Sequence, residues 1–208
     1  MSPITPSRAI PALILAVLAL DPASPAIAVE TVQGTIAAIT AEDWRVSGLS
    51  FSVDAGEPLN GSLRIASLEL PSIELSLADV LVECRRIELS AVEFGCLDAE
   101  YTLDLPDVGQ LEFPGEAVYE RRSGATRFVL REIPLAQGKI TLRGTATADA
   151  VEIEYSGEML KLDGLTELAQ RFTPGGIALT ASGTGNLSGA ARLRDGSVTN
   201  ASMRAEVS

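Results

Sequence analysis

The sequence predicts an all-β protein, mainly antiparallel, with one short helix near residues 165–172. Apolar and polar residues alternate from about Thr31 to Leu162, which is the period of strands with one buried and one wet face. Gly, Pro and Asn-Gly turn signals interrupt this alternation at short intervals, as in a meander of short strands. The buried face is mostly aliphatic, because the chain has only five Phe, three Tyr and one Trp.

The first 28 residues have the layout of a secretory signal peptide. Arg8 makes the amino-terminal end positive, residues 10–20 (IPALILAVLAL) form an apolar run, and residues 26–28 (AIA) form an A-x-A cleavage site. The run is shorter than the roughly 20 residues that cross a bilayer as a helix. We therefore expect cleavage after Ala28 and a β-rich domain over residues 29–208 in the periplasm. An uncleaved inner-membrane anchor is the alternative.

Cys84 and Cys96 are the only cysteines of a chain that we expect in a compartment permitting disulfides. The chain contains no His, so the pair cannot complete a usual four-ligand zinc site. The C-x11-C spacing does not favour redox catalysis, which typically uses C-x-x-C. We predict a disulfide, and the alternative is two reduced cysteines that pack as small apolar side chains.

Three segments align without gaps, at residues 67–78, 79–90 and 91–102, and place the two cysteines in one column. Within each unit the apolar residues switch once from even-numbered to odd-numbered positions, between the sixth and the ninth residue of the unit. A regular strand would not allow this switch on one face, so we predict a bulge or turn there. Chance similarity between amphipathic strands is the alternative. A chain reversal around Ser90 would place residues whose numbers sum to 180 opposite each other, and would bring Cys84 against Cys96.

One segment, residues 163–172, has helical periodicity. Leu165, Leu168, Ala169 and Phe172 fall at i, i+3, i+4 and i+7, and Thr-Pro-Gly-Gly follows as a stop signal. A helix of about two turns is too short to be stable alone, so we expect its apolar stripe to pack on an end or edge of the sheet. Small-residue alternation resumes after it and continues without a closing element.

The charge balance excludes several function classes. The chain has 16 Lys and Arg, 28 Asp and Glu and no His, for a formal net charge of −12. Nucleic-acid binding needs clustered basic charge, and the common hydrolase mechanisms need His. We therefore expect no enzyme, no cofactor, no metal site and no nucleic-acid partner. Glu152 and Glu154 alternate with apolar residues and are explained by a solvated strand face.

Arg85-Arg86 and Arg121-Arg122 are the only basic doublets. Anionic lipid headgroups could attract such doublets. Pairing with the neighbouring acidic residues on the surface is the interpretation that we favour. Those acidic residues are Glu83, Glu88 and Glu120.

Four segments resemble the amino-terminal part of YdbH-type proteins, which carry the label of a dicarboxylate-transport domain and belong with the AsmA-like envelope proteins. They are WRVSGLSFSVD from Trp44, LRIASLELP from Leu63, LADVLVECRRIELSAVEFGCLDAEYTL from Leu77, and GAARLRDG from Gly189. The similarity covers most of residues 30–205. It rests on strand motifs, a W-x-x-x-G-L opening and the paired cysteines, without a catalytic signature.

The resemblance implies a long antiparallel sheet of the repeating β-groove type, folded like a taco and apolar inside, which conducts phospholipids between the inner and outer membranes. Inner- and outer-membrane envelope proteins are then the expected protein partners. Family members are usually several hundred residues long and anchored in the membrane. We therefore expect this chain to be the amino-terminal part of a longer architecture, a short paralogue or one end of an assembly. Transport of a dicarboxylate has no physical support in a chain without an evident basic pocket.

A sheet with one aliphatic face must bury that face against a second sheet, against itself or against a ligand. A wall of Leu, Ile and Val without polar anchors suits acyl chains, which form no hydrogen bonds. We predict phospholipid binding along ten residues, named the lipid strip: Leu68, Leu70, Leu75, Leu77, Val80, Val82, Ile87, Leu89, Phe94 and Tyr101. The alternative is a secreted structural or adhesin-like β-protein with a dry sandwich core and no lipid ligand.

Overall fold

The structure is a computed structural model that describes residues 29–41, 44–71, 75–105, 108–165, 182–194 and 197–207. The predicted signal peptide lies outside the described residues. Residues 162–165 are helical, and the rest of the predicted helix also lies outside them. The strands are β1 (Thr31–Thr40), β2 (Arg45–Asp54), β3 (Asn60–Leu70), β4 (Leu75–Leu89), β5 (Glu93–Leu105), β6 (Gly109–Glu120), β7 (Ala125–Leu135), β8 (Gly138–Ala146), β9 (Ala150–Lys161), β10 (Thr184–Arg194) and β11 (Ser197–Val207).

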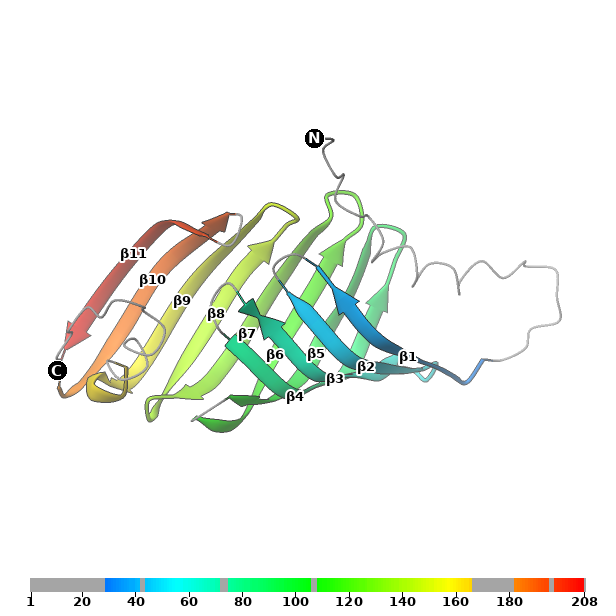
Figure 1. Cartoon of the computed structure of the whole chain (residues 1–208), viewed down its shortest axis with the longest axis horizontal. Coiled ribbons are helices and arrows are strands. Elements are labelled where there is room, and N and C mark those ends of the chain that lie inside the picture. The colour runs from blue at the N-terminus through cyan, green and yellow to red at the C-terminus, as the bar shows by residue number, and fades with distance from the viewer. Residues whose placement is uncertain are drawn as a thin grey trace.

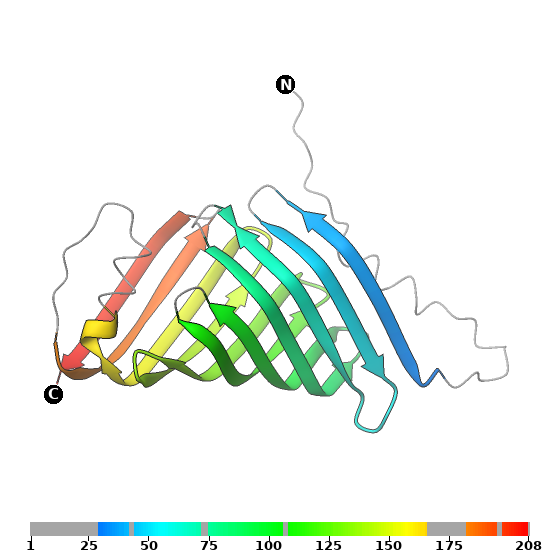
Figure 2. The ribbon, with the colours of Figure 1, turned by 60° about the horizontal axis from the view of Figure 1, so that its bottom comes forward.

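The strands form one open sheet in which the spatial order equals the sequence order, from β1 to β11. Each strand pairs antiparallel with its sequence neighbours. The predicted all-β antiparallel fold with a short helix is confirmed, and the open sheet is consistent with the β-groove type. Figures 1 and 2 show a strong twist, so that the strands of the amino-terminal half cross those of the carboxyl-terminal half at a steep angle.

Cross-strand partners share a face of the sheet, so the register shows which residues lie together. One row is mainly apolar and crosses β1 to β6. We name the side of the sheet that carries this row the apolar face, and the opposite side the polar face. The row consists of Gly34, Phe51, Leu63, Val82, Tyr101 and Phe113.

In each of β1 to β4 the alternation of apolar residues is interrupted once, and the four interruptions lie next to one another in the sheet. Small residues lie side by side there. Gly48 of β2 has φ +60, and a Cβ there would lie 2.7 Å from the Cβ of Ala66 on β3. Next to them, the hydroxyls of Ser47 and Ser67 lie 2.6 Å apart and share a hydrogen bond. Asp79 of β4 has φ 47. The extra residue in each strand keeps the apolar side chains on one face across the irregularity.

The predicted parity changes in the second and third repeat units are confirmed. In β4, Arg85 and Arg86 separate Cys84 from Ile87, and the register with β5 shifts there. In β5, the register with β6 shifts between Cys96 and Ala99. In the first unit the change falls between the end of β3 and the start of β4, and residues 72–74 lie outside the described residues.

The predicted register of the β4–β5 hairpin is wrong by three residues. The chain reverses after Ser90 and not around it, because the Ser90 amide donates to the Glu93 carbonyl (2.8 Å) and the Glu93 amide donates to the Ser90 hydroxyl (2.9 Å). Most paired residues therefore have numbers that sum to 183: Cys84 faces Ala99, and Cys96 faces Ile87. The two cysteines lie diagonally across the hairpin.

The best-buried part of the apolar face lies on β6 and β7. Leu111, Phe113 and Ile133 form a buried cluster, against which side chains of β5, β7 and β8 pack. Leu160, at the end of β9, is fully buried, and the Lys161 amide next to it donates to the Ala136 carbonyl in the β7–β8 turn (2.8 Å). Among the described strands, all extensive contacts join neighbours in the sheet.

Candidate functional site

The structure places the lipid strip on the apolar face. Leu68 lies opposite Leu77, Val82 lies opposite Tyr101, and Leu89 lies opposite Phe94. Val80 and Ile87 lie opposite Ile65 and Cys96. Leu70 pairs with Leu75 through the backbone, and the side chains of these two residues lie outside those described.

The lipid strip is most exposed at the β4–β5 turn and becomes more buried along the strands. Leu89 and Phe94, next to the turn, are 49% and 38% exposed. The other lipid-strip residues with described side chains are half-buried. Further along the same strands, Cys84 is 8% exposed and Ala99 is 1% exposed. The lipid strip is therefore most exposed next to the β4–β5 turn.

Sequence analysis missed Leu111, Phe113 and Ile133, the buried cluster of this face. The lipid strip was drawn from the repeat units, which end at residue 102, whereas the cluster lies on the next two strands. The alternation of Leu111 and Phe113 before Pro114-Gly115 was the signal that could have found it. The ring of Phe113 lies parallel to that of Tyr101, with centroids 5.5 Å apart, so the cluster is continuous with the lipid strip.

Aromatic rings on the apolar face lie over glycines of neighbouring strands. Gly144 pairs with Phe128 and Gly189 pairs with Tyr155, and a Cβ at either glycine would lie only 2.5 Å from a ring or hydroxyl atom of its partner. The rings thus occupy the space that side chains at these positions would fill. This arrangement keeps bulky groups close to the sheet, in the manner of aromatic rescue of strand glycines.

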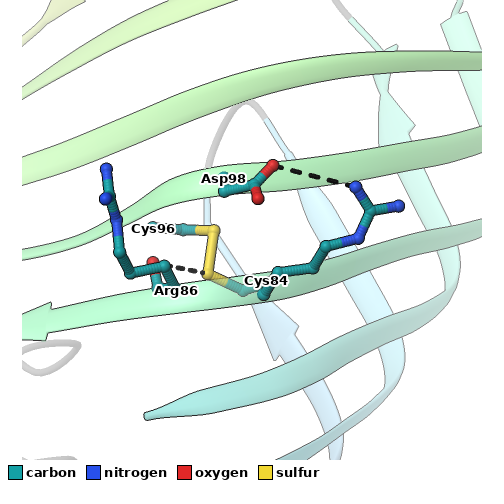
Figure 3. Close-up of a disulfide and its surroundings, with 5 residues drawn as sticks. Cys84, Arg86, Cys96 and Asp98 are labelled. Carbon is teal, nitrogen blue, oxygen red and sulfur yellow. Dashed lines mark hydrogen bonds and ion pairs between the residues drawn. A yellow bond between two sulfur atoms is a disulfide. The ribbon is translucent and has the colours of Figure 1, made fainter. Parts of the chain in front are cut away.

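The disulfide between Cys84 and Cys96 is present, with Cα atoms 5.8 Å apart. It joins the irregular segments of β4 and β5 (Figure 3), and the Cys84 sulfur also lies 3.3 Å from the Arg86 carbonyl oxygen. On the polar face of the same hairpin, Arg85 lies 3.9 Å from Asp98. A disulfide is consistent with an oxidising location.

The two basic doublets do not form the expected ion pairs with Glu83, Glu88 and Glu120. Arg85 forms ion pairs with Asp98 and with Glu100 (3.3 Å), because the register brings these β5 residues beside it. Neither Arg121 nor Arg122 forms an ion pair with a described residue. Glu120 instead accepts a hydrogen bond from the Ser123 hydroxyl (2.7 Å).

A hollow of about 770 Å³ lies on the polar face of β6 to β11, away from the lipid strip. Among its lining residues are Glu116, Arg127, Arg143, Glu152, Glu154 and Arg192. Their charges are largely balanced within the sheet: Arg192 contacts Glu152 (3.3 Å), and Glu116 contacts a neighbouring arginine (3.0 Å). Its lining has three arginines and three glutamates, so the hollow has no excess positive charge to hold a dicarboxylate.

The chemistry of the apolar face suits an inert wall. Burial raises the pKa of the Tyr101 hydroxyl, and the negative charge of Glu116 raises it further, so both favour the neutral phenol.

No group of side chains among the described residues has the composition to hold a metal ion. Within the same residues, no helix has the length and hydrophobicity to cross a membrane.

Comparisons with protein-family models, with curated proteins and with solved structures find no match to this chain.

Proposed function

We propose that the chain is a lipid-binding and lipid-transfer module of the cell envelope, which holds phospholipid acyl chains on its apolar face. One observation carries this proposal: the apolar face spans the sheet, and among the described strands extensive contacts join sheet neighbours only. A second layer of strands, which would cover the face in a sandwich, is not among them. The half-buried aliphatic side chains therefore present a surface to a ligand.

Acyl chains match this surface in chemistry and in dimensions. Each methylene that leaves a bilayer for water costs about 0.8 kcal/mol, so a carrier must offer a continuous apolar wall. The apolar row across β1 to β6 has six members, and at a strand spacing of about 4.8 Å it extends roughly 24 Å. The absence of buried charged or polar residues among the described ones also suits an alkyl ligand.

The envelope location and the protein partners rest on the sequence. The signal-like segment of residues 1–28 and the resemblance to AsmA-like proteins point to the periplasm, with inner- and outer-membrane envelope proteins as partners. The disulfide is compatible with that compartment.

A structural or adhesin-like role without a lipid ligand is the second candidate function. It is favoured by the buried cluster of Leu111, Phe113 and Ile133, which is packed by protein side chains. In that case the remaining apolar face would be covered by protein rather than by lipid.

Lipid extraction and native mass spectrometry of periplasmically produced protein test the proposal. We expect co-purifying phospholipid, and we expect photocrosslinkers at positions 82 and 89 to capture it. Val82→Asp places a charge in the middle of the lipid strip and should abolish loading, because a carboxylate on an apolar surface disfavours acyl-chain contact. Leu81→Asp is the matched control, since Leu81 lies opposite Arg64 and Thr102 on the polar face.

Two results would contradict the proposal. One is well-folded protein without lipid, in which positions 82 and 89 crosslink only to protein. The other is equal lipid loading of Val82→Asp and wild-type protein, with both folded as judged by circular dichroism. Unfolding of Val82→Asp in a lipid-free preparation would support the structural alternative, because a buried charge destabilises a dry core.

A further inference from the structure

We propose that the adjoining tips of the β4–β5 and β6–β7 hairpins bind an anionic lipid bilayer surface. We name this site the hairpin tip. It extends the proposed function by stating where the molecule meets a membrane, and it can be tested without measuring lipid loading. It consists of Leu89, Val92, Phe94, Arg121 and Arg122.

A backbone hydrogen bond joins the two tips. The Arg121 amide donates to the Val92 carbonyl (2.8 Å), which fixes the start of the β6–β7 turn beside the β4–β5 turn. Within the second turn, the Gly124 amide donates to the Glu120 carbonyl (2.9 Å). The valine and the two arginines therefore belong to one surface, although about thirty residues separate them in the sequence.

Three large apolar residues of the hairpin tip are exposed close to one another. Val92 is 59% exposed, Leu89 is 49% exposed and Phe94 is 38% exposed. Exposed apolar groups that are clustered in this way mark interaction sites more often than scattered ones do. Aliphatic and aromatic side chains beside basic residues are also the composition of surfaces that sit in the bilayer interface.

The arginines supply charge complementarity to lipid phosphates. Arg122 is exposed and Arg121 is half-buried, and among the described residues neither guanidinium has an ion-pair partner. The nearest acidic residues, Glu93 and Glu120, are the strand residues that border the two turns. Arg127 neutralises Glu93 (2.7 Å), and Ser123 donates to Glu120. Within the described part of the chain, no acidic side chain competes with lipid phosphates for these two guanidinium groups, in a chain whose net charge is −12.

The hairpin tip is continuous with the apolar face. Leu89 and Phe94 are cross-strand partners at the exposed end of the lipid strip, and Phe94 also pairs with Tyr119 of β6. An acyl chain that left a bilayer at the hairpin tip would reach the half-buried part of the strip along the same two strands. A bilayer surface therefore fits this site better than a protein partner does. Only a bilayer would explain why the hairpin tip is continuous with the lipid strip.

Vesicle sedimentation with the purified protein tests this proposal. We expect wild-type protein to bind vesicles of phosphatidylcholine mixed with phosphatidylglycerol more tightly than vesicles of phosphatidylcholine alone. The variant R121Q/R122Q should lose about fivefold in binding to the mixed vesicles for each arginine removed. The matched control R85Q/R86Q has the same net charge, but its doublet lies away from the hairpin tip, and its binding should equal that of wild-type protein.

A second pair of variants tests the apolar part. Val92→Asp should weaken binding to both kinds of vesicle, whereas Val207→Asp should not, although Val207 is 64% exposed. Equal losses for the two arginine doublets, or equal losses for the two valine variants, would overturn the proposal, as would an absence of wild-type binding.

The outcomes separate this proposal from the proposed function. Vesicle binding that depends on the hairpin tip, in protein that never carries lipid, would support the hairpin tip and contradict the lipid-carrier function. Lipid-loaded protein whose vesicle binding is the same in R121Q/R122Q and R85Q/R86Q would leave the carrier function standing and overturn the hairpin tip.

Discussion

Glycines determine the shape of the apolar face at the level of single residues. Because Gly144 and Gly189 have no side chains, the rings of Phe128 and Tyr155 can lie across neighbouring strands. Gly34 of β1 has the same relation to Phe51 of β2, on the same face in the amino-terminal part of the sheet. Rings that projected from the sheet would fill the space above it, as they do between the layers of a sandwich. The glycines thus let these rings lie close to the sheet rather than project from it.

The disulfide is the residue-scale feature with the largest expected effect on stability. Replacing both cysteines, as Cys84→Ala/Cys96→Ala, should lower the free energy of unfolding by about 2–3 kcal/mol, because the bond restricts the unfolded chain over a short loop. Urea unfolding measures this difference. Intact-mass analysis with alkylation verifies that native wild-type protein has no free thiol.

Reduction supplies the control for that measurement. A reductant should lower the urea midpoint of wild-type protein toward that of the double variant and should leave the variant unchanged. Free thiols in native wild-type protein, or a reductant effect of equal size in both proteins, would contradict the stabilising role of the bond.

At the scale of single elements, the β4–β5 hairpin keeps its apolar residues on one face through irregular segments in both strands. Two residues, Arg85 and Arg86, separate Cys84 from Ile87, where a regular strand would have one. Deleting Arg85 should therefore turn Ile87 and Leu89 to the polar face and strongly destabilise the protein. Urea unfolding and circular dichroism would detect the loss.

Two further variants make this prediction specific. Arg85→Ala removes two exposed ion pairs, with Asp98 and with Glu100, without changing the register, and should cost less than about 1 kcal/mol. Deleting Leu97 together with Arg85 removes the extra residue from both strands and should restore much of the stability. On β6, the single residue Glu116 lies between Ala117 and Gly115, which pair with Cys96 and Ala99, so a β5 strand without the extra residue would match β6. A double deletion that is less stable than the single deletion would contradict this account.

At the scale of the whole molecule, the sheet behaves as a nearly one-dimensional array, because extensive contacts join only neighbouring strands among those described. Stability in such an array is a sum over neighbours, so strands with one neighbour open more easily than those with two. We expect the hydrogen-bonded amides of β1 and β11 to exchange with deuterium faster than those of β4 to β7. Mass spectrometry of exchanged peptides measures the difference, and uniform protection across the sheet would contradict it.

The sequence by itself determined the features that depend on local pattern. Strict alternation predicts strands because successive side chains point to opposite faces, and this sufficed for the antiparallel all-β fold. The parity changes at Cys84 and Cys96 predicted irregularities in both strands for the same reason. The disulfide was also predicted from the sequence, on the signal-like segment and on the shared repeat column of the two cysteines.

Only the tertiary structure decided which residues lie opposite each other. A reversal that is displaced by a residue or two changes every pair, and for this reason Cys84 faces Ala99 and Arg85 pairs with Asp98 rather than with a sequence neighbour. The position of Arg121 beside Val92 likewise depends on a contact between two hairpins. Periodicity assigns a residue to a face, but burial and pairing depend on what the rest of the sheet places beside it.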